Sequence, residues 1–140
     1  MAKILFLTQI VPFPPDAGPK VKTYHVIRAL AGQGHSVTLV SFVRPEEVRH
    51  IPALREICDA VHEVPIHRSR VADIGYMIRS YLTNRPFLIE RDDLRPMQET
   101  VNQLVREDDF QFIHADQLTM GQFAIRVASA FPNKKRKVVL

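Results

Sequence analysis

The stretch "KILFLTQIVPFPPDAGPK", residues 3–20, decides the fold. It begins with a continuous apolar run at residues 4–7, which is typical of a parallel strand that is buried on both faces. Four prolines and a single glycine, Gly18, occur before an apolar helix pattern begins near Val21. Because the turn contains neither G-x-G-x-x-G nor a Walker sequence, it lacks the usual glycine-rich cradle for a phosphate group. Each proline fixes φ, so the sequence predicts a strand and a helix joined by a stiff loop.

The alternation of strand and helix patterns continues along the whole chain. Further strands are predicted at residues 37–42, 61–66, 110–114 and 137–140, and helices at 21–31, 45–58, 71–82, 94–105 and 118–131. Pro65 favours an edge position for the strand that contains it. Alternating strands and helices form right-handed βαβ units. We therefore predict an α/β fold, a Rossmann-like doubly wound parallel sheet with helices on both faces, in a single domain spanning residues 1–140.

The carboxyl ends of the predicted strands carry the candidate site, because ligands bind at this edge of open parallel sheets. We expect the loop at residues 12–19 to line the main cleft there. Gly18 is the one loop position at which a ligand can approach the main chain closely. Lys20 and Lys22 follow at the predicted helix N-terminus, where free amides and the helix dipole favour an anion. A rigid connector without a ligand is the alternative interpretation of this loop.

Composition excludes several classes of protein. The formal charge of +4 arises from the run at residues 134–137, which is typical of a solvated turn, so we expect no nucleic-acid partner. Cys58 is the only cysteine, which suits a reducing compartment. The prolines directly after the apolar start do not fit a secretory signal, and we expect a cytoplasmic location. No Asp-x-Asp motif or cluster of His and Cys predicts a metal site.

The order of these motifs resembles the beginning of glycosyltransferase family 4. The matching residues are Pro14, Pro15, Gly18, Leu30, Ala31, Gly34, His35, Val37 and Thr38. In addition, "FQFIHADQLTMGQFA", residues 110–124, resembles a later strand and helix of that family. The resemblance implies the N-terminal, acceptor-side domain of a GT-B fold. It also implies that the chain is a fragment that lacks a C-terminal domain, where most of the nucleotide-sugar binds.

The activity that this resemblance implies is that of a retaining, hexosyltransferase-type glycosyltransferase of polysaccharide biosynthesis. The partners that the resemblance implies are a nucleotide-sugar co-substrate and a glycan or lipid-linked acceptor. It implies no separate cofactor. We expect the fragment alone to be inactive. An alternative is a non-enzymatic, flavodoxin-like binding or regulatory domain. A receiver domain of that kind has acidic residues after its first strand, where this chain has Thr8 and Gln9.

Two departures from the family pattern affect the site residues. Pro19 replaces the second glycine of the loop and removes one possible amide donor. After the fourth predicted strand, His114 is present, but Asp116 stands where many members have a second histidine. A carboxylate can accept a hydrogen bond from a substrate hydroxyl. We therefore predict Asp116 as the catalytic residue, and Gly18, Lys20, Lys22 and His114 as donor- or acceptor-binding residues.

Three further patterns have simpler interpretations. Glu99 and Glu107 have E-x7-E spacing, but they lie on a polar helix without a glycine-rich loop, so we interpret them as solvated. For the pairs at residues 92–93 and 108–109 we predict helix capping. Residues 71–82 form an amphipathic helix flanked by arginines. We expect its apolar face to cover the sheet, and the alternative is a peripheral contact with an anionic membrane at its inner face.

Overall fold

A computed structural model describes all 140 residues, from Met1 to Leu140. Five strands form one sheet in the order β3-β2-β1-β4-β5, and every neighbouring pair is parallel. The strands are β1 (Lys3–Thr8), β2 (Ser36–Val43), β3 (Ala60–Pro65), β4 (Phe112–Ala115) and β5 (Lys137–Val139). The predicted Rossmann-like α/β fold is therefore confirmed, and β3, which contains Pro65, is an edge strand as expected.

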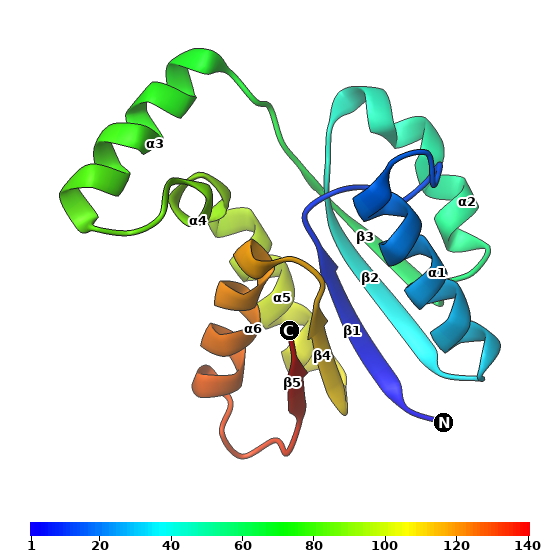
Figure 1. Ribbon diagram of the computed structural model, residues 1–140. Coiled ribbons are helices and arrows are strands. Elements are labelled where there is room, and N and C mark those ends of the chain that lie inside the picture. Colours follow the sequence, from blue (N-terminus) through cyan, green and yellow to red (C-terminus); the bar gives the residue numbers. More distant parts are fainter.

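Helices cover both faces of this sheet (Figure 1). The helical elements are α1 (Gly18–Gly32), the 3-10 helix η1 (Pro45–His50), α2 (Ile51–Arg55), α3 (Arg70–Thr83), α4 (Phe87–Asp92), α5 (Arg95–Glu107) and α6 (Leu118–Ala130). Helices α1 and α2 cover one face, and α5 and α6 cover the other. From β1 the chain crosses to β2 on one side, whereas β4 pairs with β1 on the other side. The topological switch point therefore lies between the carboxyl ends of β1 and β4.

Successive side chains of β1 build two separate cores. Leu5 and Leu7 pack among apolar side chains of α5 and α6. Phe6 points to the opposite face and packs in the cluster that contains Ile27 of α1. All three strand residues are fully buried. This two-sided burial is the reason why β1 appears in the sequence as a continuous apolar run rather than as an alternating one.

Helix α1 begins and ends where its proline and glycines predict. Pro19 lies in the first turn, where its fixed φ suits the helix and its missing amide hydrogen costs no intrahelical bond. After the helix ends at Gly32, Gly34 has a φ of +84°, in the left-handed region that favours glycine. The amides of Gln33 and Gly34 donate to carbonyls of the last helical turn. The stiff loop thus leads directly into a well-terminated helix.

The prediction that residues 71–82 cover the sheet is wrong. Helix α3 lies away from the sheet and contacts α4, and none of its residues is buried (Figure 1). Its large apolar side chains face solvent, with exposed fractions from 56% to 88%: Val71, Ile74, Met77, Ile78, Tyr81 and Leu82. We call these six residues the outward face of α3. Helix α4, which the sequence analysis did not predict, connects α3 to the rest of the domain.

Candidate functional site

Asp116 lies directly after β4, at the switch point, and its side chain is 1% exposed. The Thr23 hydroxyl of α1 donates to its Oδ2, and Gln117 Nε2 donates to the same oxygen over 2.5 Å. The other oxygen, Oδ1, accepts no hydrogen bond, although Lys22 Nζ lies 3.4 Å away as an ion pair. The predicted residues Asp116 and Lys22 are therefore brought together, and one buried carboxylate oxygen remains without a hydrogen-bond donor.

A chain of side-chain hydrogen bonds runs from Asp116 along the carboxyl edge of the sheet. Gln117, which donates to Asp116, accepts from the main-chain amide of Gln9 over 2.8 Å. Gln9 Nε2 in turn donates to Asp92 Oδ2 over 2.5 Å. Asp92 is fully buried, and Arg68 Nη2 lies 2.6 Å from its Oδ1. We call these five residues, Asp116, Gln117, Gln9, Asp92 and Arg68, the edge network, because they connect the ends of β4 and β1 with α4 and the segment after β3.

His114 adds a titratable ring beside this network. It stacks on Phe6 with ring centroids 4.5 Å apart, and its Nε2 lies 4.0 Å from Asp116 Oδ1. Burial lowers the pKa of His114 below its usual value of 6.5, Lys22 lowers it further, and the charge of Asp116 acts in the opposite direction. The ring also lines a hollow of about 220 Å³ on the α1 face, together with Ala2, Ile4, Leu30, His35, Phe112 and Val139.

Gly18 and Lys20 lie apart from the buried carboxylate. Gly18 is exposed, and a Cβ atom placed on it has no atom within 4 Å. Lys20 pairs with Asp16 over 3.5 Å rather than with Asp116. The loop at residues 12–19 lines none of the five hollows within this domain, and Gly18 is not covered by its own domain, as expected. The reason is that Val11 and Pro12 are buried, while residues 16–19 project into solvent.

Two other hollows lie at the carboxyl edge. One, of about 400 Å³, is lined by Arg44, Pro45, Glu46, Ile66, His67 and Arg68. The other, of about 350 Å³, is lined by Gln9, Pro86, Phe87, Leu88, Ile89, Gln117, Leu118 and Thr119, and we call it the α4–α6 hollow. Its Gln9 and Gln117 belong to the edge network, whereas α4 and Leu118 supply apolar walls. The sequence analysis missed this hollow because it left α4 unassigned.

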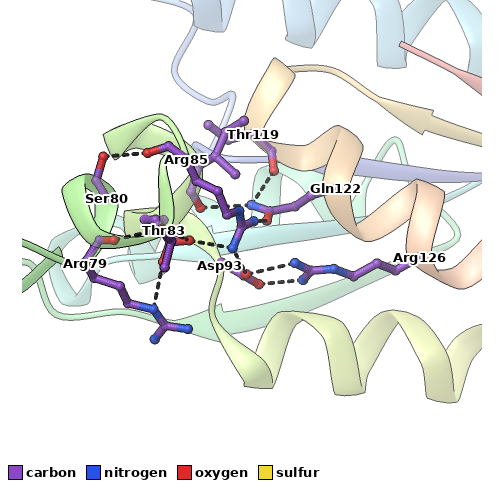
Figure 2. Close-up of polar contacts among 10 residues, drawn as sticks. Arg79, Ser80, Thr83, Arg85, Asp93, Thr119, Gln122 and Arg126 are labelled. Carbon is purple, nitrogen blue, oxygen red and sulfur yellow. Dashed lines mark hydrogen bonds and ion pairs between the residues drawn. The ribbon is translucent and has the colours of Figure 1, made fainter. Parts of the chain in front are cut away.

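A second buried carboxylate, Glu90, holds α3 and α4 together. Its side chain is 1% exposed. Arg79 Nε lies 2.9 Å from its Oε2, and Arg85 Nη1 lies 2.5 Å from its Oε1. Figure 2 shows how these side chains converge from α3 and the segment after it. The buried carboxylate of Glu90 is thus paired with two guanidinium groups, although its Oε2 accepts no hydrogen bond.

Asp93 and Asp108 lie at helix ends, as the C-cap residues of α4 and α5, but no aspartate of the pairs at residues 92–93 and 108–109 N-caps a helix as predicted, and all four form ion pairs. Asp93 accepts hydrogen bonds from both terminal nitrogens of Arg126, at 2.6 and 2.8 Å (Figure 2). These hydrogen bonds lower the pKa of Asp93. Asp108 and Asp109 pair with Lys3 and Lys134, each at 2.7 Å. No helix has an aspartate as its N-cap. Capping was inferred from local sequence, whereas these partners are distant along the chain.

The remaining candidates take no part in the edge network. Glu99 and Glu107 are exposed, and Glu99 pairs with Arg95 over 2.7 Å, which agrees with the solvated interpretation. Cys58 is buried, and desolvation raises the pKa of its thiol to about 12, with a smaller contribution from Asp59. No group of three or more His, Cys, Asp or Glu side chains is placed to hold a metal ion.

The comparisons with known proteins bear on the fold. No family model and no curated protein matches the sequence. Two crystal structures of the C-terminal domain of a Pyrococcus furiosus hydrogenase match 99% of this chain, each with a TM-score of 0.65, at 14% and 15% identity, and this chain covers 89% and 91% of them. An Arabidopsis thaliana UDP-glycosyltransferase in complex with UDP also matches 99% of this chain, with a TM-score of 0.53 and 14% identity.

The extent of these matches differs. This chain covers 33% of the Arabidopsis thaliana protein, whereas it spans almost the entire hydrogenase domain. At such low identity, each likeness shows the fold alone. The chain is thus a Rossmann-like α/β domain with a five-stranded parallel sheet and a distant structural likeness to a glycosyltransferase.

Proposed function

We propose that this chain is the acceptor-side domain of a retaining, hexosyltransferase-type glycosyltransferase of GT-B fold. It moves a sugar from a nucleotide-sugar donor to a glycan or lipid-linked acceptor in polysaccharide biosynthesis. The observation that carries this proposal is the edge network at the switch point, with the unpartnered Oδ1 of Asp116 at one end. The distant match in fold to a UDP-glycosyltransferase in complex with UDP, of which this chain covers 33%, supports a nucleotide-sugar as a partner.

Asp116 is the proposed catalytic residue. A substrate hydroxyl donates a hydrogen bond to Oδ1, the carboxylate oxygen that has no hydrogen-bond donor of its own. For this contact Lys22 moves aside, which its 68% exposed side chain permits. The Lys22 ammonium group then pairs with a phosphate of the donor. His114, neutral because its pKa is lowered, contributes a further polar contact without a charge.

Gly18 and Lys20 are the proposed donor-binding residues on the loop. The exposed main chain at Gly18 allows a ligand carried by the second domain to approach the N-terminus of α1. Lys20 adds a positive charge two residues after that position, and its partner Asp16 is exposed. This explains why the loop can serve a ligand although it lines no hollow within its own domain.

The α4–α6 hollow is the proposed acceptor site. Gln9 and Gln117 provide polar groups at its edge, and apolar walls come from Phe87, Leu88 and Leu118. Such a mixed lining suits a sugar that is attached to an apolar carrier. The hollow adjoins Asp116 through Gln117, which places acceptor binding beside the proposed catalytic residue.

A second candidate function is that of a non-enzymatic, flavodoxin-like binding or regulatory domain. The Pyrococcus furiosus hydrogenase domain favours it, because a chain of almost the same extent exists there as a C-terminal domain. The two functions differ in one respect that can be measured. A transferase needs Asp116 and Gly18 for turnover, whereas a binding domain turns over no nucleotide-sugar.

The test uses the complete open reading frame that contains this chain, with UDP- and GDP-sugars and a lipid extract as the acceptor source. We expect nucleotide release that Asp116→Asn lowers by about ten- to a thousand-fold in kcat/KM. We expect Gly18→Val to lower turnover severely. Lys20→Ala combined with Lys22→Ala should raise KM in a salt-dependent manner. The matched control is Lys135→Ala with Lys137→Ala, two exposed lysines remote from the site.

Two outcomes contradict the proposal. If no nucleotide-sugar supports release, or if folded Gly18→Val keeps the wild-type kcat/KM, the loop is only a connector. Calorimetry on the 140-residue chain tests the division between domains. We expect only feeble binding of a nucleotide-sugar there, and micromolar affinity would place the donor site on this chain instead.

A further inference from the structure

Helix α3 lies at one extremity of the molecule and presents its apolar side to solvent (Figure 1). At 3.6 residues per turn, the outward face of α3 occupies an arc of about 140°. The exposed fractions of its six residues correspond to about 800 Å² of accessible surface, at roughly 200 Å² for each large residue. A monomeric protein rarely leaves an apolar patch larger than about 600 Å² uncovered. The outward face of α3 is therefore large enough to be an interaction surface.

Contacts on the other side of α3 fix this orientation (Figure 2). Arg79 Nε lies 2.9 Å from Glu90 Oε2 of α4. The Ser80 hydroxyl donates to the carbonyl of Arg85 over 2.5 Å, and Arg85 in turn donates to Gln122 Oε1 of α6 over 3.2 Å. Helix α3 is thus attached to α4 and α6 through its polar side, and its apolar side is free to meet a partner.

The charges on α3 balance one another. Arg79 is paired with the buried Glu90. Asp73, the only acidic residue of α3, offsets Arg70, which is exposed and forms no ion pair. The helix therefore has no net charge that would repel a second copy of itself, and no net positive charge that would favour an anionic surface. A large apolar surface without net charge is typical of homodimer interfaces.

The apolar residues of α3 have the spacing of a short coiled-coil seam. Four of them are separated by three, four and three positions, as the a and d positions of a heptad are: Val71, Ile74, Ile78 and Tyr81. When two copies of α3 lie antiparallel, one register matches both layers of this seam. Val71 then faces Tyr81 of the second copy, and Ile74 faces Ile78 of the second copy. The seam is therefore complementary to itself about a two-fold axis.

The position of Arg70 favours an antiparallel pair over a parallel one. In an antiparallel pair, Arg70 of one copy lies near the C-terminal end of α3 of the other. That end carries the negative pole of the helix dipole, and the last turn of α3 contains no basic residue. In a parallel pair, the two Arg70 side chains would instead be neighbours, and like charges oppose such an interface.

We propose that a second copy of this chain docks on the outward face of α3, and that the two copies form a two-fold dimer through an antiparallel pair of α3 helices. The area available on each copy matches the roughly 800 Å² per partner that a stable dimer buries. Gly75 lies beside the seam, where a Cβ atom would meet no atom of its own chain within 4 Å. The missing side chain leaves room for the second helix to approach closely. The dimer does not depend on the proposed transfer reaction.

Sedimentation velocity of the 140-residue chain measures this association. We expect monomer and dimer in exchange, with a dissociation constant of about 1–100 μM, because the interface is small for a stable dimer. Ile74→Ser with Ile78→Ser should weaken the dimer by about a hundredfold or more, since each dimer loses four apolar side chains from its interface. The control, Val48→Ser with Ile125→Ser, alters similarly exposed residues of η1 and α6 and should leave the constant unchanged. Urea midpoints at low protein concentration should be similar for both variants, because none of the substituted residues is buried.

Engineered cysteines test the antiparallel register. In this register, Ile74 of one copy is level with Ile78 of the second, whereas each of the two residues is offset by about 6 Å along the helix axis from its own counterpart. In a Cys58→Ala background, a mixture of Ile74→Cys and Ile78→Cys proteins should therefore form an intermolecular disulfide under mild oxidation. We expect this reaction to be about tenfold faster than for either protein alone. Faster linkage of each variant with itself would indicate a parallel pair and would overturn the proposed arrangement.

Three results would overturn the docking of a second copy. The first is a chain that stays monomeric at about 200 μM. If that monomer floats with lipid vesicles, lipid covers the outward face of α3 instead. The second is a dimer whose dissociation constant is unchanged by the two serine substitutions, which would place the interface elsewhere. The third is a complete open reading frame that is monomeric where this chain dimerises, which would assign the face to another part of that protein.

Discussion

Thr23 of α1 donates a hydrogen bond to Asp116 at the end of β4, although the two residues are 93 positions apart. Thr23 is fully buried, and its Oγ1 also lies 2.9 Å from the carbonyl oxygen of Pro19, in the first turn of its own helix. Asp116 thereby joins the end of β4 to the N-terminal part of α1. The position of the α1 N-terminus relative to the switch point depends on this contact.

Thr23→Val keeps the shape of the side chain and removes its hydroxyl. We expect a loss of about 1–3 kcal/mol in the free energy of unfolding, because a buried carboxylate loses a donor. Thr100→Val is the matched control, since Thr100 also donates to a proline carbonyl four residues earlier, over 2.8 Å, but binds no carboxylate. Urea unfolding at pH 7 measures both. Equal losses in the two variants would contradict a special role for the Thr23–Asp116 contact.

Glu90→Gln should loosen α3 without unfolding the sheet. The substitution leaves Arg79 and Arg85 without their buried anion, and we expect a loss of about 1–3 kcal/mol. Hydrogen exchange should accelerate in α3 and stay unchanged in β1 and β2. The control, Glu99→Gln, breaks only the exposed pair with Arg95 and should cost less than about 1 kcal/mol. Unchanged exchange in α3 would mean that Glu90 does not hold the helix.

His114 should make stability depend on pH near neutrality. Because burial lowers its pKa below 6.5, the unfolded chain binds the proton more readily than the folded protein does. The stability that His114 contributes is therefore complete above pH 6.5 and is lost as the pH falls through the lowered pKa. Urea midpoints between pH 5 and 8 should fall less steeply for His114→Gln than for the wild type. An NMR titration that gives a pKa above 6.5 would contradict this prediction.

Gly18→Ala should leave the fold intact. The new Cβ meets no atom within 4 Å, and the φ of Gly18 is not in the left-handed region. We expect a change within about 0.5 kcal/mol in the free energy of unfolding. Gly34→Ala is the contrast, because a φ of +84° strains any other residue, and we expect a loss of about 1 kcal/mol. Thermal unfolding compares the two, and a large loss in Gly18→Ala would make Gly18 structural.

Cys58 should be unreactive in the native protein. Its thiol is buried, and a pKa of about 12 leaves almost no thiolate at pH 8. Modification by a disulfide reagent at pH 8 should therefore become fast only in urea, and its rate should follow unfolding. Rapid modification without urea would show that the segment around Cys58 opens locally.

The sequence by itself determined the five strands, the parallel sheet and the edge position of β3. Each of these follows from local patterns: the two-sided burial of β1 produces an unbroken apolar run, Pro19 suits only the first turn of a helix, and Gly34 allows a left-handed turn. It also placed Asp116, His114 and Lys22 at one edge, because the carboxyl ends of parallel strands meet there.

Only the tertiary structure decided which side of α3 faces the protein and which aspartates are buried. Periodicity defines the two sides of a helix, but Arg79 is held by Glu90 of α4, and Asp92 by Gln9 and Arg68, from other parts of the chain. Glu90 is buried between Arg79 and Arg85, and these contacts between separate elements fix which side of α3 faces the protein. The apolar side of α3 points outward, an orientation that its own sequence does not reveal.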